Sequence, residues 1–127
     1  MIEREVIWEG KKELELELPL KFVEELKDKL KQFGDLKFDR KIFASPRGEI
    51  IKNELFLFKE IDGITSLKCE VKATIEGKRL VLESKHVVEK NYGSSLFLDF
   101  YKQSREKRAT KSALRISKVL RKLLSAR

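Results

Sequence analysis

The chain has 127 residues, and charged residues make up 39 % of it. Its single cysteine, Cys69, excludes an internal disulfide, and its single histidine, His86, excludes a histidine-rich metal site. The net charge of +8 is unevenly placed, because residues 101–127 hold ten Lys or Arg against one acid and are +9 by themselves. The length predicts one domain, over residues 1–127, that can bury a core without disulfides or metal.

Composition also indicates where the protein works. The sequence has no run of about 18 apolar residues, and charged residues follow Met1 where a signal peptide would be apolar, so we expect a cytoplasmic protein. Lys and Glu are abundant while Asn and Gln together number four, which is typical of thermophilic proteins. We therefore expect a source that grows at high temperature.

The first expected elements are β structure over residues 1–18 and a helix over 19–33. Residues 12–18 alternate Leu with Glu, which predicts a half-buried strand. Its inward face would carry three leucines, Leu14, Leu16 and Leu18. Residues 5–8 are also β-prone, and Glu9-Gly10 is either a turn between strands or a bulge in one long strand. Pro19 suits a first helical position, and Gly34 supplies the C-terminal stop.

An antiparallel meander is predicted over residues 36–90. Four extended segments are separated by tight turns at Ser45-Pro46-Arg47-Gly48, Asp62-Gly63 and Gly77-Lys78, and Asp-Gly is a strong hairpin signal. The segments are 36–44, 49–60, 64–76 and 79–90. We expect the N-terminal strand to join this sheet.

One long helix is predicted over residues 94–126, since no Gly or Pro interrupts them. Ser94 or Ser95 would cap it, and Asp99 would lie in its first turn. One arc of this helix is apolar and would cover the sheet, with two alanines that allow close approach. The residues of this arc are Leu98, Ala109, Ala113, Ile116, Leu120, Leu123 and Leu124.

The opposite arc of the same helix is basic. It comprises Lys107, Arg108, Lys111, Arg115, Lys118 and Lys122. Such a row could bind several phosphates or an anionic membrane, or it could be the solvated back of the helix, and the sequence favours the solvated back. The arc holds no aromatic residue for base stacking, so contact with nucleic acid would be confined to its backbone.

No catalytic or metal-binding group of residues is apparent, so we expect neither an enzyme nor a cofactor. His86 and Ser84 share a strand face with apolar residues and could meet a ligand head group, although a single histidine there is more often structural. Cys69 is interpreted as a small buried hydrophobe. The run 55–58, Leu-Phe-Leu-Phe, is apolar on both strand faces and implies a second cover: the first helix, a cavity or a subunit interface.

The order of strand, helix, meander and long C-terminal helix resembles the helix-grip fold of the START and Bet v1-like superfamily. The resemblance uses residues 12–18 with Pro19 for the first strand and helix entry, 36–89 for the sheet and 95–126 for the gripped helix. It implies an α+β fold in which a curved sheet wraps the C-terminal helix around an apolar cavity for lipids or related ligands. The composition suits a small family of that superfamily from thermoacidophilic archaea, described as fatty-acid carriers.

A second resemblance is to triphosphate-tunnel enzymes of the CYTH type, whose first strand begins Glu-x-Glu-x-Lys. Here Glu13 and Glu15 match, but Glu17 stands at the lysine position. This resemblance would imply a closed tunnel of strands that binds triphosphate.

The leading hypothesis is a carrier that holds a fatty acid or similar lipid between the sheet and the C-terminal helix. One alternative is a module whose basic helix binds nucleic acid or anionic membrane, and another is a homodimeric interaction protein with a filled core. The residues expected to line the carrier site are Leu67, Cys69, Val71, Leu80, Leu82, Ser84, His86, Ile116, Leu120 and Leu124.

Overall fold

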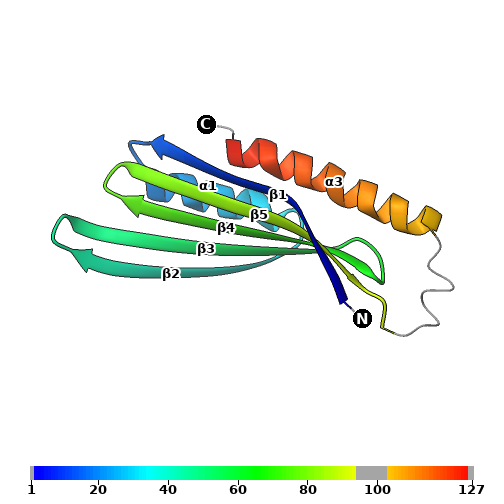
Figure 1. Ribbon diagram of the computed structural model, residues 1–127. Coiled ribbons are helices and arrows are strands. Elements are labelled where there is room, and N and C mark those ends of the chain that lie inside the picture. The colour runs from blue at the N-terminus through cyan, green and yellow to red at the C-terminus, as the bar shows by residue number, and fades with distance from the viewer. Residues whose placement is uncertain (1, 94–102, 126–127) are drawn as a thin grey trace.

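Five antiparallel strands form one open sheet in the computed structural model, which describes residues 2–93 and 103–125 (Figure 1). The order across the sheet is β1-β5-β4-β3-β2. The strands are β1 (Ile2–Glu15), β2 (Asp35–Ser45), β3 (Gly48–Glu60), β4 (Thr65–Glu76) and β5 (Arg79–Asn91). The predicted meander is thus confirmed as β2 to β5, and β1 joins it by pairing with β5.

Tight turns define the hairpins of the meander. The turn from β2 to β3 passes through Pro46-Arg47 and ends at Gly48, whose φ of 121° is rarely adopted by L side chains. Gly77 has a φ of 62° in the turn from β4 to β5. Between β3 and β4, Asp62 Oδ1 accepts hydrogen bonds from two backbone N–H groups, including that of Thr65 at 2.6 Å. Each turn lies where the sequence predicted it.

The N-terminal β structure is one strand, so the two-strand alternative is excluded. Its bulge lies between Val6 and Trp8 and not at the predicted Glu9-Gly10, which pairs with β5 in regular register. Gly10 lies inside this strand, and the Trp8 indole occupies the space that a side chain at Gly10 would need. The strand ends at Glu15, and Leu18 is 64 % exposed. The prediction that Leu18 shares the buried face is therefore wrong, because the chain has already left the sheet to enter the helix.

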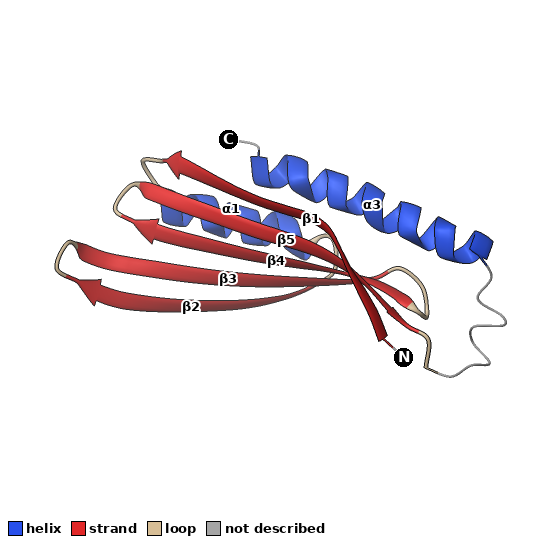
Figure 2. Ribbon diagram, viewed as in Figure 1, coloured by secondary structure: helices blue, strands red, loops and turns tan. Residues whose placement is uncertain are grey.

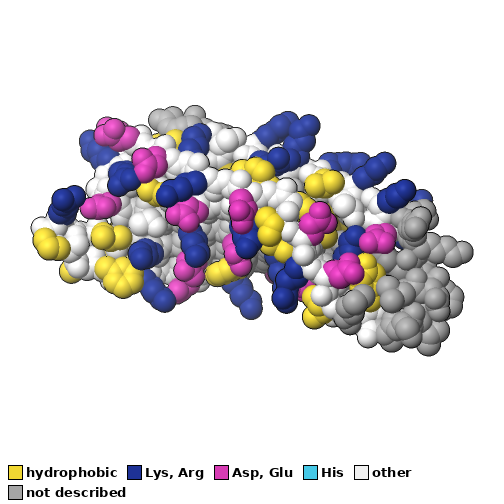
Figure 3. Space-filling model, in the orientation of Figure 1, with side chains coloured by type: hydrophobic (Ala, Val, Ile, Leu, Met, Phe, Trp, Pro, Cys, Tyr) yellow, Lys and Arg dark blue, Asp and Glu magenta, His cyan; other side chains and the backbone are white. Residues whose placement is uncertain are grey.

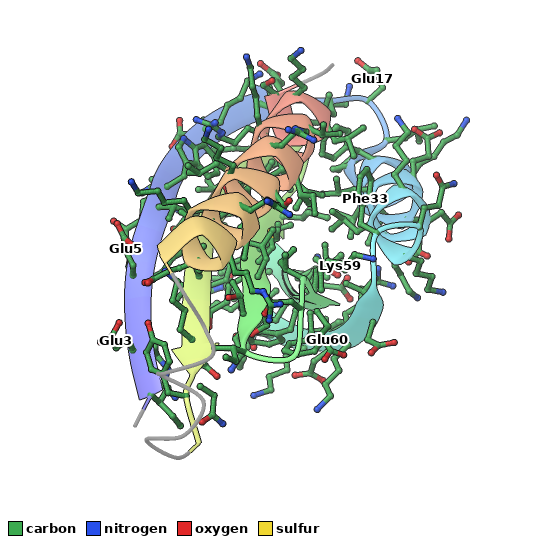
Figure 4. All side chains as sticks on the ribbon, turned by 90° about the vertical axis from the view of Figure 1, so that its right-hand side faces the viewer. Glu3, Glu5, Glu17, Phe33, Lys59 and Glu60 are labelled. Atoms are coloured by element: carbon green, nitrogen blue, oxygen red, sulfur yellow. The ribbon has the colours of Figure 1, made fainter. Side chains whose placement is uncertain are left out.

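Two helices, α1 (Pro19–Lys31) and α3 (Gln103–Ser125), pack on the same face of the sheet (Figure 2). Viewed along the strands, the sheet curves around both helices (Figure 4). Gly34 follows α1 and lies against β3, where a Cβ would collide with the carbonyl oxygen of Phe58. The N-terminal part of the predicted long helix, including Ser94, Ser95, Leu98 and Asp99, lies outside the described residues.

The hydrophobic core lies between this concave face of the sheet and the two helices. From α1 it includes Val23, Leu26 and Leu30, and from α3 Ala113, Leu120 and Leu124. Ala109 and Ala113 are buried, as predicted, and their small side chains let α3 approach the strands closely. The strand residues of the core are Leu55, Leu57, Leu67, Cys69, Val71, Ala73, Ile75, Leu80, Leu82 and Val88.

The convex face of the sheet is left uncovered by the described helices. Leu55 and Leu57 point into the core, whereas Phe56 and Phe58 point outward and are 39 % and 40 % exposed. The first helix is therefore not the second cover of this strand, because it packs on the same face as α3. Over the strands, acidic and basic side chains alternate with a few hydrophobic ones (Figure 3).

The described strands leave the sheet open along β1 and β2 rather than closing a tunnel. Glu13 and Glu15 are exposed on the convex face, where Glu13 pairs with Arg79. This arrangement contradicts the tunnel that the triphosphate-tunnel resemblance would imply.

Candidate functional site

Most of the predicted lining residues are packed against one another in the core. Ile116 is partly buried at the edge of that core. Seven others each expose at most 3 % of their surface, so little open space lies beside them. These seven are Leu67, Cys69, Val71, Leu80, Leu82, Leu120 and Leu124.

A polar contact crosses this apolar interior between β5 and α3. His86 Nδ1 lies 2.6 Å from Ser117 Oγ, and the two residues are 0 % and 1 % exposed. The Trp8 ring packs on the imidazole, with their ring centroids 4.9 Å apart. The register Trp8↔His86 between β1 and β5 and the inward face of α3 bring the three side chains together.

The titratable groups of this interior stay uncharged at neutral pH. Burial, with a smaller contribution from the nearby Arg121 guanidinium, lowers the pKa of His86 from 6.5 to about 4. Burial and the charge of Glu70 raise the pKa of the Cys69 thiol to about 12, so this residue behaves as the predicted small hydrophobe.

Two buried nitrogens at this site have no hydrogen-bond partner among the described residues: His86 Nε2 and Arg121 Nε. Arg121 also lies near Trp8, with its guanidinium carbon 5.9 Å from the centroid of the indole ring. Its Nε is always a donor, and when Ser117 donates its hydroxyl hydrogen to Nδ1, the ring proton of His86 sits on Nε2. The site then presents two donors that lack an acceptor, and leaving such groups unpaired is costly.

A pocket of about 220 Å³ opens beside these groups, between β1, β5 and the C-terminal half of α3. Lys12 Nζ donates to the backbone oxygen of Ser125 at 2.9 Å, which holds β1 against the end of α3. The volume is below the roughly 300–1,000 Å³ of most small-molecule sites. The pocket is lined by Trp8, Gly10, Lys11, Lys12, Leu82, Ser84, Arg121, Leu124 and Ser125.

Of the residues predicted to line the carrier site, Leu82, Ser84 and Leu124 border this pocket, whereas Trp8, Ser117 and Arg121 were not predicted as site residues. One signal was available for Ser117, because it interrupts the apolar arc of α3 between Ala113 and Leu120. A lone polar residue on each of two facing apolar surfaces indicates a buried polar pair.

The contact between Ser117 and His86 combines a hydroxyl group with a neutral imidazole. A serine next to a histidine is a nucleophile with its base, but Ser117 is too deeply buried for a substrate to reach its hydroxyl. In the described parts of the chain, no group of three or more His, Cys, Asp or Glu is placed to hold a metal ion. Neither described helix is long and apolar enough to span a membrane.

The basic arc of α3 is confirmed as an exposed face. All six of its residues, Lys107, Arg108, Lys111, Arg115, Lys118 and Lys122, are exposed. Within the described ranges, none of them forms an ion pair.

Comparison with known proteins identifies no family for this chain. No family model matches it, and no curated protein does. Among solved structures, an uncharacterized protein from Rhizobium leguminosarum aligns over 94 % of this chain and 97 % of its own, with 12 % identity and a TM-score of 0.26. That score is too low to support an inference about fold or function.

Proposed function

We propose that this protein is a non-enzymatic binding protein of helix-grip type that takes an amphipathic carboxylate, such as a fatty acid or similar lipid. The open antiparallel sheet curved around a C-terminal helix is compatible with that fold. The unpartnered donor Arg121 Nε, on a side chain that lines the pocket of about 220 Å³, carries the proposal. A carboxylate has acceptors only, so it would satisfy this donor and pair with the guanidinium charge.

The apolar part of the ligand would lie against Leu82, Leu124 and the Trp8 ring, with Ser84 at the wall. Burial of its chain would supply about 25 cal/mol for each Å² removed from water. Because the rest of the interior is filled, a short chain fits the pocket as it stands, and a long chain requires α3 to move away from the sheet.

Trp8 is the only tryptophan of the chain, so its fluorescence reports directly on the pocket. We expect titration with fatty acids of increasing length to change this fluorescence, and Arg121→Gln to weaken binding about tenfold to a hundredfold, because a charged hydrogen bond is lost. Arg115→Gln, an exposed change on the same helix, is the control and should bind as the wild type does. Native mass spectrometry of the purified chain would detect lipid carried through purification.

Two results would contradict this function. The first is the absence of any co-purified lipid together with no response of Trp8 to any chain length. The second is equal binding of a fatty acid and its methyl ester, which would show that Arg121 does not recognise a carboxylate.

A second candidate function, a homodimeric interaction protein, is favoured by the exposed Phe56 and Phe58 on the convex face. They border a hollow of about 630 Å³ that is lined by both acids and bases, so a copy related by a two-fold axis could pair them across the interface. The charged residues of this hollow are Asp35, Lys37, Lys68 and Glu70.

The dimer makes its own prediction. Phe56→Lys combined with Phe58→Lys should convert a dimer to a monomer in light scattering after size exclusion, because the apolar contact is lost and each subunit would have to bury two more charges. Ile42→Lys is the control, since Ile42 is 60 % exposed at the edge strand β2. A wild-type monomer at high protein concentration would eliminate this candidate.

A further inference from the structure

The outward face of α3 concentrates positive charge that the fold does not use. Its six exposed cations extend from Lys107 to Lys122, which is about 22 Å along the helix axis. The acid of this helix, Glu106, is turned away from them and pairs with Lys90 of β5 at 2.8 Å. Basic side chains gather along the position of α3 in Figure 3. The row is therefore free to meet an external anion.

Two large apolar side chains flank this row. Leu114 and Val119 are 43 % and 42 % exposed, so they lie outside the buried apolar stripe of α3. At 100° per residue they lie on either side of the line formed by Lys111, Arg115 and Lys122. The surface thus has cations along its centre and an apolar group on each margin.

The combination of cations with flanking apolar side chains favours one anionic partner, a lipid bilayer, over another, nucleic acid. A nucleic-acid backbone would use the cations but would leave Leu114 and Val119 without a contact, and the described part of this face has no aromatic residue for stacking. An anionic bilayer uses both, because cations remain among the lipid head groups while apolar side chains reach the acyl boundary.

We propose that the outward face of α3 docks on the surface of an anionic lipid bilayer. The apolar stripe of α3 remains packed on the sheet, so only Leu114 and Val119 enter the bilayer surface and docking is peripheral and reversible. The pocket beside Arg121 is lined in part by the same helix. The docking surface itself does not depend on the ligand proposed above.

The test is co-sedimentation of the full chain with vesicles of phosphatidylcholine alone and of phosphatidylcholine with phosphatidylglycerol. Binding is expected only to the anionic vesicles and should be lost at high salt. Changing Lys111, Arg115, Lys118 and Lys122 to Glu should weaken it by at least about a hundredfold. The control variant changes four exposed lysines elsewhere in the chain to Glu, which alters the net charge by the same amount. These are Lys21, Lys41, Lys59 and Lys72. The control variant should retain binding within roughly tenfold, because distant charges are screened.

A second variant keeps every charge. Leu114→Ser with Val119→Ser should lower vesicle binding about tenfold through lost apolar contact and leave any binding to duplex DNA unchanged. Circular dichroism checks that each variant is folded. The proposal is overturned if neutral and anionic vesicles bind alike, if both charge variants lose binding equally, or if duplex DNA binds tightly while the vesicles do not.

Discussion

Lowering the pH from about 6.5 to about 4 is expected to reduce the free energy of unfolding by about 3 kcal/mol through His86 alone. The unfolded chain binds a proton at His86 near pH 6.5, whereas the folded chain, in which this side chain is 0 % exposed, resists protonation until about pH 4. Stability is therefore greatest above pH 6.5, falls across this interval and loses nothing further through His86 below it. Urea unfolding followed by circular dichroism at a series of pH values measures the change.

The double variant His86→Phe with Ser117→Ala should lose this acid dependence, because it removes the imidazole together with its hydrogen-bond partner. Ser117→Ala alone keeps the imidazole and should keep the dependence. Glu89 and Glu106, whose pKa values are lowered by hydrogen bonds from basic side chains, also destabilise the fold in acid but do so equally in every variant. Parallel curves for the wild type and the double variant between pH 6.5 and 4 would show that His86 is not the cause.

The strands and turns were predictable because local chemistry decides them. Gly48 and Gly77 occur where the backbone needs a positive φ, and the alternation along residues 65–76 matches the burial of β4. Which face of the sheet receives α1 was not predictable, because the Leu-Phe-Leu-Phe run is apolar on both faces. The core uses Leu55 and Leu57, while Phe56 and Phe58 remain exposed.

The candidate site was predictable only in part. Alternation along β5 placed Ser84 and His86 on the inner face, and the structure confirms this. Which residue of α3 faces His86 depends on the rotation and position of the helix over the sheet, and no local pattern specifies these. Trp8 was also missed, because the bulge after Val6 determines that its ring reaches His86 rather than another partner.

Leu80→Ala is expected to lower the free energy of unfolding by about 2–5 kcal/mol, the cost of a large-to-small change in a filled core. Leu80 is 0 % exposed and lies between Leu14 of β1 and Ile75 of β4. Leu18→Ala is the matched control: the same atoms are removed from a side chain that is 64 % exposed, so the cost should stay within about 0.5 kcal/mol. Urea unfolding followed by Trp8 fluorescence measures both.

The loss of stability in Leu80→Ala also indicates how a ligand enters the interior. If Leu80 lined an open cavity in solution, its truncation would leave few contacts to lose and would cost less than about 1 kcal/mol. A loss in the full range instead means that the interior is closed around its own side chains, so a long acyl chain can enter only as α3 separates from the sheet. In that case a bound lipid would raise the free energy of unfolding of the wild type, by an amount set by the ratio of its concentration to its dissociation constant. A ligand confined to the pocket beside Arg121 would bind Leu80→Ala and the wild type with equal affinity.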